Sequence, residues 1–143
     1  SLGYPDREAE KQIFRAQQTE HPIETLRAVM SATDVVSLQN EARRVKVGES
    51  VMDYLMSIVG ATRSHPQLEV GASPRAGISL MRAAQALALC EGRDYVLPDD
   101  VKTLAVPVLS HRVICRNRAV ATGGFSEAAS IIVAVLDSVP VPL

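Results

Sequence analysis

Apolar residues recur at helical spacing along most of the chain. The pattern is clearest over residues 49–65 and 74–91, where it predicts two amphipathic helices. His65-Pro66 ends the first of them, and Gly92 is a residue type favoured just after a helix. The predicted buried positions are Met52, Leu55, Met56, Ile58, Val59 and Thr62 in the first helix and Leu80, Met81, Ala84, Leu87 and Ala88 in the second.

Two further helices are predicted before residue 49. Pro5 suits the first position of a helix that ends at His21-Pro22. Thr33 is the predicted cap of the next helix, which runs to about Arg44. The residues between these helices show no clear periodicity. The expected apolar positions are Ala9, Ile13 and Ala16 in the first helix and Val35, Leu38 and Ala42 in the second.

Two more helices are predicted after Gly92. One begins at Pro98 and carries acidic residues in its first turn, as the helix dipole favours. Pro107 removes a backbone donor from this helix and is expected to kink or end it. The last helix runs over about 126–138 and is rich in Ile, Val and Ala.

The remaining segments are predicted to be loops. Residues 66–73 and 111–124 connect helices, and no pair of strands is evident anywhere in the sequence. Short connections favour a single helical bundle. The sequence therefore predicts an all-α fold, a compact bundle of about five to six helices, as one domain over residues 3–143.

Composition narrows the classes of partner. Hydrophobic residues make up 47% of the 143 positions, which is typical of a folded domain, but aromatic residues only 3%. So few aromatics disfavour single-stranded nucleic acid, which binds by stacking on them. The net charge of −1 gives no reason to expect a basic DNA-binding face. Arg112, Arg116 and Arg118 do cluster, and we interpret them as a solvated loop.

Cysteine content and hydropathy indicate a cellular compartment. Cys90 and Cys115 are the only cysteines, too few for a disulfide framework, and they lack metal-binding spacing. Two reduced thiols favour a cytoplasmic protein. No signal peptide and no apolar run of about 18 residues is present, so neither secretion nor membrane insertion is expected.

The usual catalytic and metal-binding motifs are absent. The chain has neither a P-loop nor a dinucleotide-binding glycine motif. His21, His65 and His111 lack ligand spacing and lie near predicted helix ends, where capping or surface roles are expected. Asp99-Asp100 is interpreted as a structural pair that complements the helix dipole and caps free N–H groups. No metal site is predicted.

One helix start departs from the dipole rule. Residues 71–77 read GASPRAG, so Pro74 is followed by Arg75, whereas Pro5 and Pro98 are each followed by aspartate. A positive charge in the first turn is unfavourable by about 0.3–1 kcal/mol. Free N–H groups, the dipole and a guanidinium together suit an anion such as phosphate. Departures of this kind often mark functional positions.

The residues alone leave open two readings of Arg75. Ser79 and Arg82 follow on the same helix face, and the three together are suited to a surface that meets something outside the domain. In the ordinary alternative, Arg75 pairs with a nearby acid or points into water. Spacing and charge do not decide between these readings.

Several stretches resemble one family. Residues 61–113 resemble the C-terminal lid of MoxR-type AAA+ ATPases, with G-A-S-P-R-A before an alanine-rich helix, then G-R-x-Y-V-x-P-x-D-V and L-x-H-R. GYPD at 3–6 resembles the point where the nucleotide-binding core of that family joins its lid. VKVGESVMDYLMSIVGATR at 45–63 also matches the family pattern. Lids of magnesium-chelatase and MCM-type ATPases are similar.

The resemblance implies a role for the GASPRAG segment. Arg75 would be the sensor-2 arginine, a catalytic residue that reaches the γ-phosphate of ATP held by a core domain. Ser73 and Pro74 belong to the same nucleotide-binding element. ATP and magnesium would be bound mainly by the core, whose P-loop, Walker B acids and arginine finger this chain lacks. The chain alone is not expected to hydrolyse ATP or to hold either ligand tightly.

The resemblance also implies partners. The lid would contact its own AAA+ core and neighbouring subunits of a ring oligomer, and would couple ATP hydrolysis to chaperone-like remodelling of other proteins. A von Willebrand A domain protein is a candidate client. Two alternatives from other classes are a stand-alone helical interaction module and a DNA-binding domain that uses residues 112–118, which the near-neutral charge disfavours.

Overall fold

The chain divides into two units, Ser1–Val35 and Val36–Leu143. The computed structural model describes residues 3–18, 21–116 and 124–142. The first unit holds α1 (Arg7–Ala16) and the 3-10 helix η1 (Pro22–Thr25). Helix α2 (Ala32–Arg44) begins in the first unit and ends in the second.

The first helix starts later and ends earlier than its sequence pattern predicts. Asp6 is the N-cap, and its carboxylate accepts a hydrogen bond from the Ala9 N–H at 2.8 Å. Pro5 therefore lies outside the helix, because the Asp6 carboxylate accepts a free N–H of the first turn and so makes Asp6 the N-cap. The helix ends at Ala16, well before His21-Pro22.

The cap of α2 is also displaced from its predicted position. Ser31 and Asp34 bond reciprocally: the Asp34 N–H donates to Ser31 Oγ at 3.1 Å, and the Ser31 N–H donates to Asp34 Oδ2 at 2.9 Å. This is a capping box, so Thr33 lies within the helix instead of capping it. The Ser31 N–H and hydroxyl lower the pKa of Asp34. Neither α1 nor α2 has a buried residue among those described, so the apolar faces predicted for these two helices are not buried in a core.

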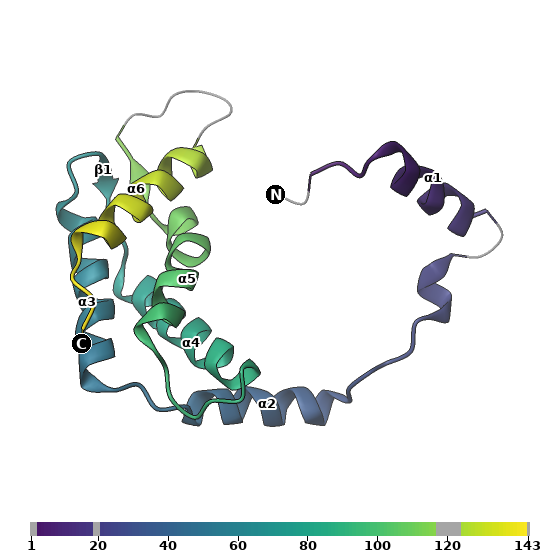
Figure 1. Cartoon of the computed structure of the whole chain (residues 1–143), viewed down its shortest axis with the longest axis horizontal. Helices are drawn as coiled ribbons and strands as arrows, with labels where there is room; N and C mark the ends of the chain where they lie inside the picture. Colours follow the sequence, from purple (N-terminus) through teal and green to yellow (C-terminus); the bar gives the residue numbers. More distant parts are fainter. Residues whose placement is uncertain (1–2, 19–20, 117–123, 143) are drawn as a thin grey trace. The chain divides into compact units, whose positions relative to one another are not determined.

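Four helices of the second unit enclose the main hydrophobic core: α3 (Glu49–Ser64), α4 (Pro74–Cys90), α5 (Pro98–Leu109) and α6 (Gly124–Ser138) (Figure 1). This arrangement confirms the all-α prediction. No helix in the described ranges is long and apolar enough to cross a membrane. The largest side chains that are almost completely buried are Ile58, Thr62, Leu80, Val101, Leu109, Ile132 and Val135.

A small antiparallel sheet lies where loops were predicted. β1 (Leu68–Val70) pairs with β2 (Ile114–Cys115), with Leu68 opposite Cys115. Arg116 extends the pairing, because its N–H donates to the Gln67 carbonyl at 2.9 Å. The prediction of no strand pair was wrong because such short strands carry no readable alternation of apolar and polar residues.

Helix α5 continues through its proline. Pro107 was expected to kink or end the helix, but the helix reaches Leu109 and passes into the 3-10 turn η2 (Ser110–Arg112). The missing N–H leaves only the Thr103 carbonyl without its helical donor. Both Thr103 and Pro107 are exposed, so water can reach that carbonyl. The cost of the proline is therefore small enough for the packed helix to continue.

The junction between α4 and α5 is closely hydrogen-bonded. Gly92 follows the C-cap of α4 with φ of 73°, a left-handed conformation that favours glycine. The Gly92 N–H donates to the Leu89 carbonyl at 2.9 Å and the Arg93 N–H to the Ala88 carbonyl at 2.8 Å. This pair of bonds is a Schellman motif, and it delivers Arg93 to the start of α5.

Arg93 and Asp100 form the main ion pair of that junction. Two guanidinium nitrogens of Arg93 donate to the two carboxylate oxygens of Asp100 at 2.7 and 2.8 Å, and Asp100 also accepts the Leu97 N–H at 2.8 Å. Asp100 is only 6% exposed. Burial by itself raises the pKa of Asp100, but the hydrogen bonds from Arg93 and Leu97 outweigh it and hold that pKa below its ordinary value. The structural interpretation of Asp99-Asp100 is thereby confirmed for Asp100.

We expect Asp100→Asn to lower the free energy of unfolding by about 1–3 kcal/mol at neutral pH, because it leaves a partly buried guanidinium poorly paired. The folded-state pKa of Asp100 is depressed, so its stabilising contribution is complete above the unfolded pKa of about 3.9 and is lost as pH falls through the folded pKa. The difference between wild type and variant should therefore narrow as pH falls below the unfolded pKa of about 3.9. Urea denaturation across this pH range measures it.

Glu91→Gln is the matched control for that experiment. Glu91 bonds the same guanidinium at 2.6 Å, but its side chain is 56% exposed. Its substitution should leave the denaturation midpoint unchanged within error, since exposed ion pairs contribute little. Equal effects of the two substitutions, or a pH-independent effect of Asp100→Asn, would contradict the assignment.

Candidate functional site

Helix α4 has a side-chain cap at its start. Ser73 is the N-cap in extended conformation, and its hydroxyl accepts a hydrogen bond from the Ala76 N–H at 3.3 Å. Pro74 occupies the first helical turn, where its missing N–H removes nothing that the helix needs. The side chain of Ser73 is thus engaged within the chain.

The segment before this cap is held by the end of α3. The Ala72 N–H donates to Thr62 Oγ1 at 2.9 Å, and the Ala72 carbonyl accepts from Arg63 Nε at 2.9 Å. Thr62 Oγ1 itself donates to the Val59 carbonyl at 2.7 Å. Thr62 and Ala72 are almost fully buried, so these bonds satisfy backbone groups that water does not reach. We call this set of contacts the Ala72 clamp.

Gly71 makes the Ala72 clamp sterically possible. A Cβ at this position would lie 2.6 Å from the Arg63 Cα and 2.7 Å from the Arg63 backbone nitrogen. Those atoms are backbone and cannot move aside as a flexible side chain would. Only glycine allows the chain to pass this close to α3. The sequence pattern places Thr62 on the buried side of its helix but does not single out Arg63 or Gly71, because their roles depend on contact between separate elements.

Arg75 projects from this rigidly held helix start. It is exposed, and its guanidinium makes no hydrogen bond or ion pair among the described residues. The reading in which it pairs with a nearby acid of the chain therefore has no support in the described ranges. The exposed guanidinium is accessible to water and to an external anion, and the positive end of the helix dipole lies beside it.

Ser79 and Arg82, the other two polar residues on this face of α4, form hydrogen bonds within the chain. The Ser79 hydroxyl donates to the Arg75 carbonyl at 3.0 Å. Arg82 donates to Gln85 Oε1 at 2.9 Å, and the Gln85 amide donates in turn to the Val45 carbonyl at 2.7 Å. Arg82 thus supports the connection between α2 and α3. Of the three, Arg75 alone has a side chain without a partner in the described part of the chain.

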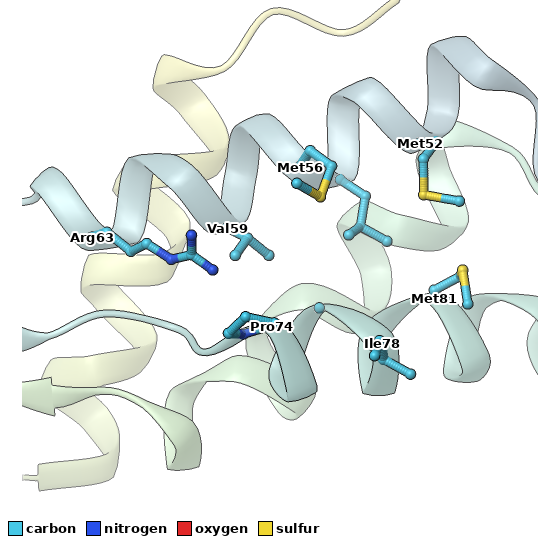
Figure 2. Close-up of a pocket in the computed structure, with 9 residues that line it drawn as sticks. Met52, Met56, Val59, Arg63, Pro74, Ile78 and Met81 are labelled. Carbon is cyan, nitrogen blue, oxygen red and sulfur yellow. The ribbon is translucent and has the colours of Figure 1, made fainter.

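A groove runs between α3 and α4 beside this helix start (Figure 2). Its volume is about 240 Å³. Arg63 and Pro74 lie at one end of it, on facing helices, as Figure 2 shows. Its apolar walls and floor are formed by Met52, Leu55, Met56, Val59, Ile78 and Met81.

The remaining candidate residues have structural positions. His21 and His65 each accept a backbone N–H two residues on, at 3.2 and 3.3 Å, which confirms the expected capping roles. His111 lies in η2 and contacts Arg112. Arg118 lies outside the described residues. Within the described ranges, no group of His, Cys, Asp and Glu side chains could hold a metal ion.

Comparison with known proteins agrees with this architecture. Residues 60–132 match the model of the AAA lid domain family. The chain is 41% identical over 142 residues to the protein YeaC of Bacillus subtilis (strain 168), covering 99% of this chain and 44% of that protein. It is 35% identical over 130 residues to chaperone MoxR1 of Mycobacterium tuberculosis, covering 85% of this chain and 34% of that one. The chain thus spans less than half of each of these relatives.

A solved structure extends the comparison. The crystal structure of a putative ATPase from Cytophaga hutchinsonii superposes with a TM-score of 0.83 at 32% identity, over 99% of this chain and 45% of that one. The chain belongs to the AAA lid domain family. Its named relatives place it more narrowly: it is a lid domain of the MoxR type of AAA+ ATPase.

Two glycine substitutions test the Ala72 clamp. We expect Gly71→Ala to lower the free energy of unfolding by about 2 kcal/mol, because the new methyl group meets backbone of α3.

Gly77→Ala is the matched control in the same segment. A Cβ at Gly77 would lie 3.4 and 3.6 Å from the side chains of Val59 and Leu55, which is ordinary contact, and alanine favours helix by up to about 1 kcal/mol. Gly77→Ala should be neutral or stabilising in thermal denaturation. Equal destabilisation by both would exclude the clamp.

Proposed function

We propose that Arg75 is the sensor-2 arginine of a MoxR-type AAA+ ATPase, and that it contacts the γ-phosphate of ATP held by a separate core domain. The proposal rests on the exposed Arg75 guanidinium, which has no partner among the described residues and lies on a helix start that the Ala72 clamp holds in place. Family membership supplies the chemistry, since AAA+ proteins are nucleotide hydrolases. The chain by itself is not expected to turn over ATP.

The residues of this chain have distinct parts in the proposal. Arg75 donates hydrogen bonds to phosphate oxygens and stabilises negative charge that develops during phosphoryl transfer. Ser73 and Pro74 position it by starting the helix, and Ser73 uses its hydroxyl for the cap. Magnesium would be held mainly by the core domain and the phosphates of ATP, as the family resemblance implies.

The proposal extends to the whole protein. Residues 3–143 act as one lid beside the nucleotide-binding core, and subunits assemble into a ring in which hydrolysis drives chaperone-like remodelling of clients. A von Willebrand A domain protein remains the candidate client. We also propose a cytoplasmic location, consistent with two free cysteines in the described ranges.

The two alternatives have less support. A stand-alone interaction module does not account for similarity to an ATPase and a chaperone over most of this chain. DNA binding by residues 112–118 is weakened because Arg116 Nε donates to the Leu68 carbonyl at 3.1 Å, which ties that side chain to β1.

We expect Arg75→Ala in the intact ATPase to lower ATP turnover at least about tenfold, because the reacting phosphoryl group loses a positioned positive charge. Steady-state phosphate release measures the effect. The free energy of unfolding should stay the same or rise by up to about 1 kcal/mol, since the change removes an unfavourable charge from the first turn and the Arg75 guanidinium makes no hydrogen bond or ion pair in the described ranges.

Arg82→Ala and Arg75→Lys sharpen that experiment. Arg82 lies on the same face of α4 but is engaged by Gln85, so its loss should leave turnover close to wild type. Lysine at position 75 keeps the charge without the planar fork and should restore only part of the activity. Unchanged turnover in Arg75→Ala would remove the sensor-2 assignment.

A further inference from the structure

The groove between α3 and α4 gathers most of the methionine in the chain. Three of the four methionines, Met52, Met56 and Met81, line it. Methionine is unbranched and polarizable, and it is enriched on surfaces that adapt to a bound partner. A concentration of this residue at one solvent-facing groove indicates an apolar surface that can adjust its shape.

The rim of this groove exposes large apolar side chains on both helices. Met56 of α3 is 58% exposed, so its predicted burial was wrong, and Ile78 of α4 is 57% exposed. Both lie on well-packed helices whose opposite faces supply the core, so their exposure is not a consequence of poor packing. Contiguous exposed apolar surface on a folded domain typically marks an interaction site.

The floor of the groove is left open at Gly77, because this residue has no side chain to fill it. The side chains of Leu55 and Val59 lie beneath it, within 3.6 Å of where a Gly77 Cβ would stand. The volume of about 240 Å³ is smaller than the roughly 300–1,000 Å³ typical of small-molecule sites. It suits a few apolar side chains from an adjoining segment better than a whole cofactor.

One end of the groove carries positive charge. Arg63 lies on the lining and is held by its Nε bond to the Ala72 carbonyl, while its two terminal nitrogens have no partner among the described residues (Figure 2). The N-terminus of α4 begins at Pro74 on the facing side. A guanidinium oriented by one bond and open at its other nitrogens is suited to a carboxylate. No acidic side chain lines the groove to compete for it.

We propose that this groove binds an amphipathic helical segment of a partner protein that presents a stripe of aliphatic side chains and a carboxylate at one end. The aliphatic stripe would lie on the methionines and Ile78, and the carboxylate would pair with Arg63. This is the helix-in-groove mode of recognition. It is independent of the role of Arg75, which does not line the groove.

Methionine methyl NMR on the full chain tests this proposal, because Met30 provides an internal reference outside the groove. The probe is a synthetic helix of roughly 14 residues with leucines at i, i+3, i+4 and i+7. Two versions of the peptide are made, one with two glutamates at its N-terminal end and one with two glutamates at its C-terminal end. Together they sample both orientations in the groove. We expect the signals of Met52, Met56 and Met81 to shift on titration and that of Met30 to stay in place.

Two matched changes separate the apolar and charged contributions. Replacing the glutamates of the peptide by lysines should weaken binding about tenfold or more, because Arg63 would then face a like charge. This control leaves the protein unaltered. Ile78→Ser in the protein should weaken binding of the glutamate peptide at least about fivefold while preserving the fold, since that side chain is largely exposed.

Several results would overturn the proposal. Failure of both glutamate peptides to shift the three methyl signals would do so, as would equal binding of the lysine peptide. Shifts of the same methyl signals by ATP alone would assign the groove to nucleotide. Self-association of the chain that Ile78→Ser abolishes would assign it to a second copy. None of these results bears on turnover in Arg75→Ala, so the two proposals fail separately.

Discussion

The second unit depends on how residues 71–73 are attached to the end of α3. Both backbone polar groups of the buried Ala72 are satisfied by α3 side chains, Thr62 on one side and Arg63 on the other. Gly71 allows the approach because any Cβ would meet backbone. Unsatisfied buried backbone groups are costly, so the attachment admits little variation in position. The direction in which α4 begins follows from it.

Two adjacent surfaces of different character result from this attachment. Arg75 leaves the helix start with its guanidinium unpaired in the described ranges, which suits a phosphate supplied from outside the chain. Arg63 donates through Nε to the Ala72 carbonyl, and its guanidinium also lines the apolar groove between α3 and α4. The same contact thus positions a candidate nucleotide sensor and one end of a candidate docking groove.

The accuracy of the sequence-based predictions varied with the length of the signal. Helices α3 and α4 carry long apolar periodicities, and both were predicted within about two residues of their observed ends. The strands β1 and β2 are too short for any alternation to be readable, and their pairing joins residues far apart in the chain. Caps were predicted less well in the first unit because several residue types suit an N-cap, and only local geometry selects Asp6 or Ser31. Pro107 was misjudged because its effect depends on whether the orphaned carbonyl is solvent-exposed.

The sequence alone determined the helical class, the family and the anomalous charge at Arg75, because periodicity, motif and the sign of a charge are properties of consecutive residues. Only the tertiary structure decided that Arg82 is engaged by Gln85 while Arg75 is left without a partner in the described ranges. It also decided that Gly71 contacts α3 and that three methionines share one groove. The contact at Gly71 and the methionine groove arise where separate helices meet. Their geometry depends on packing distances of a few tenths of an ångström, which no pattern along a single chain encodes.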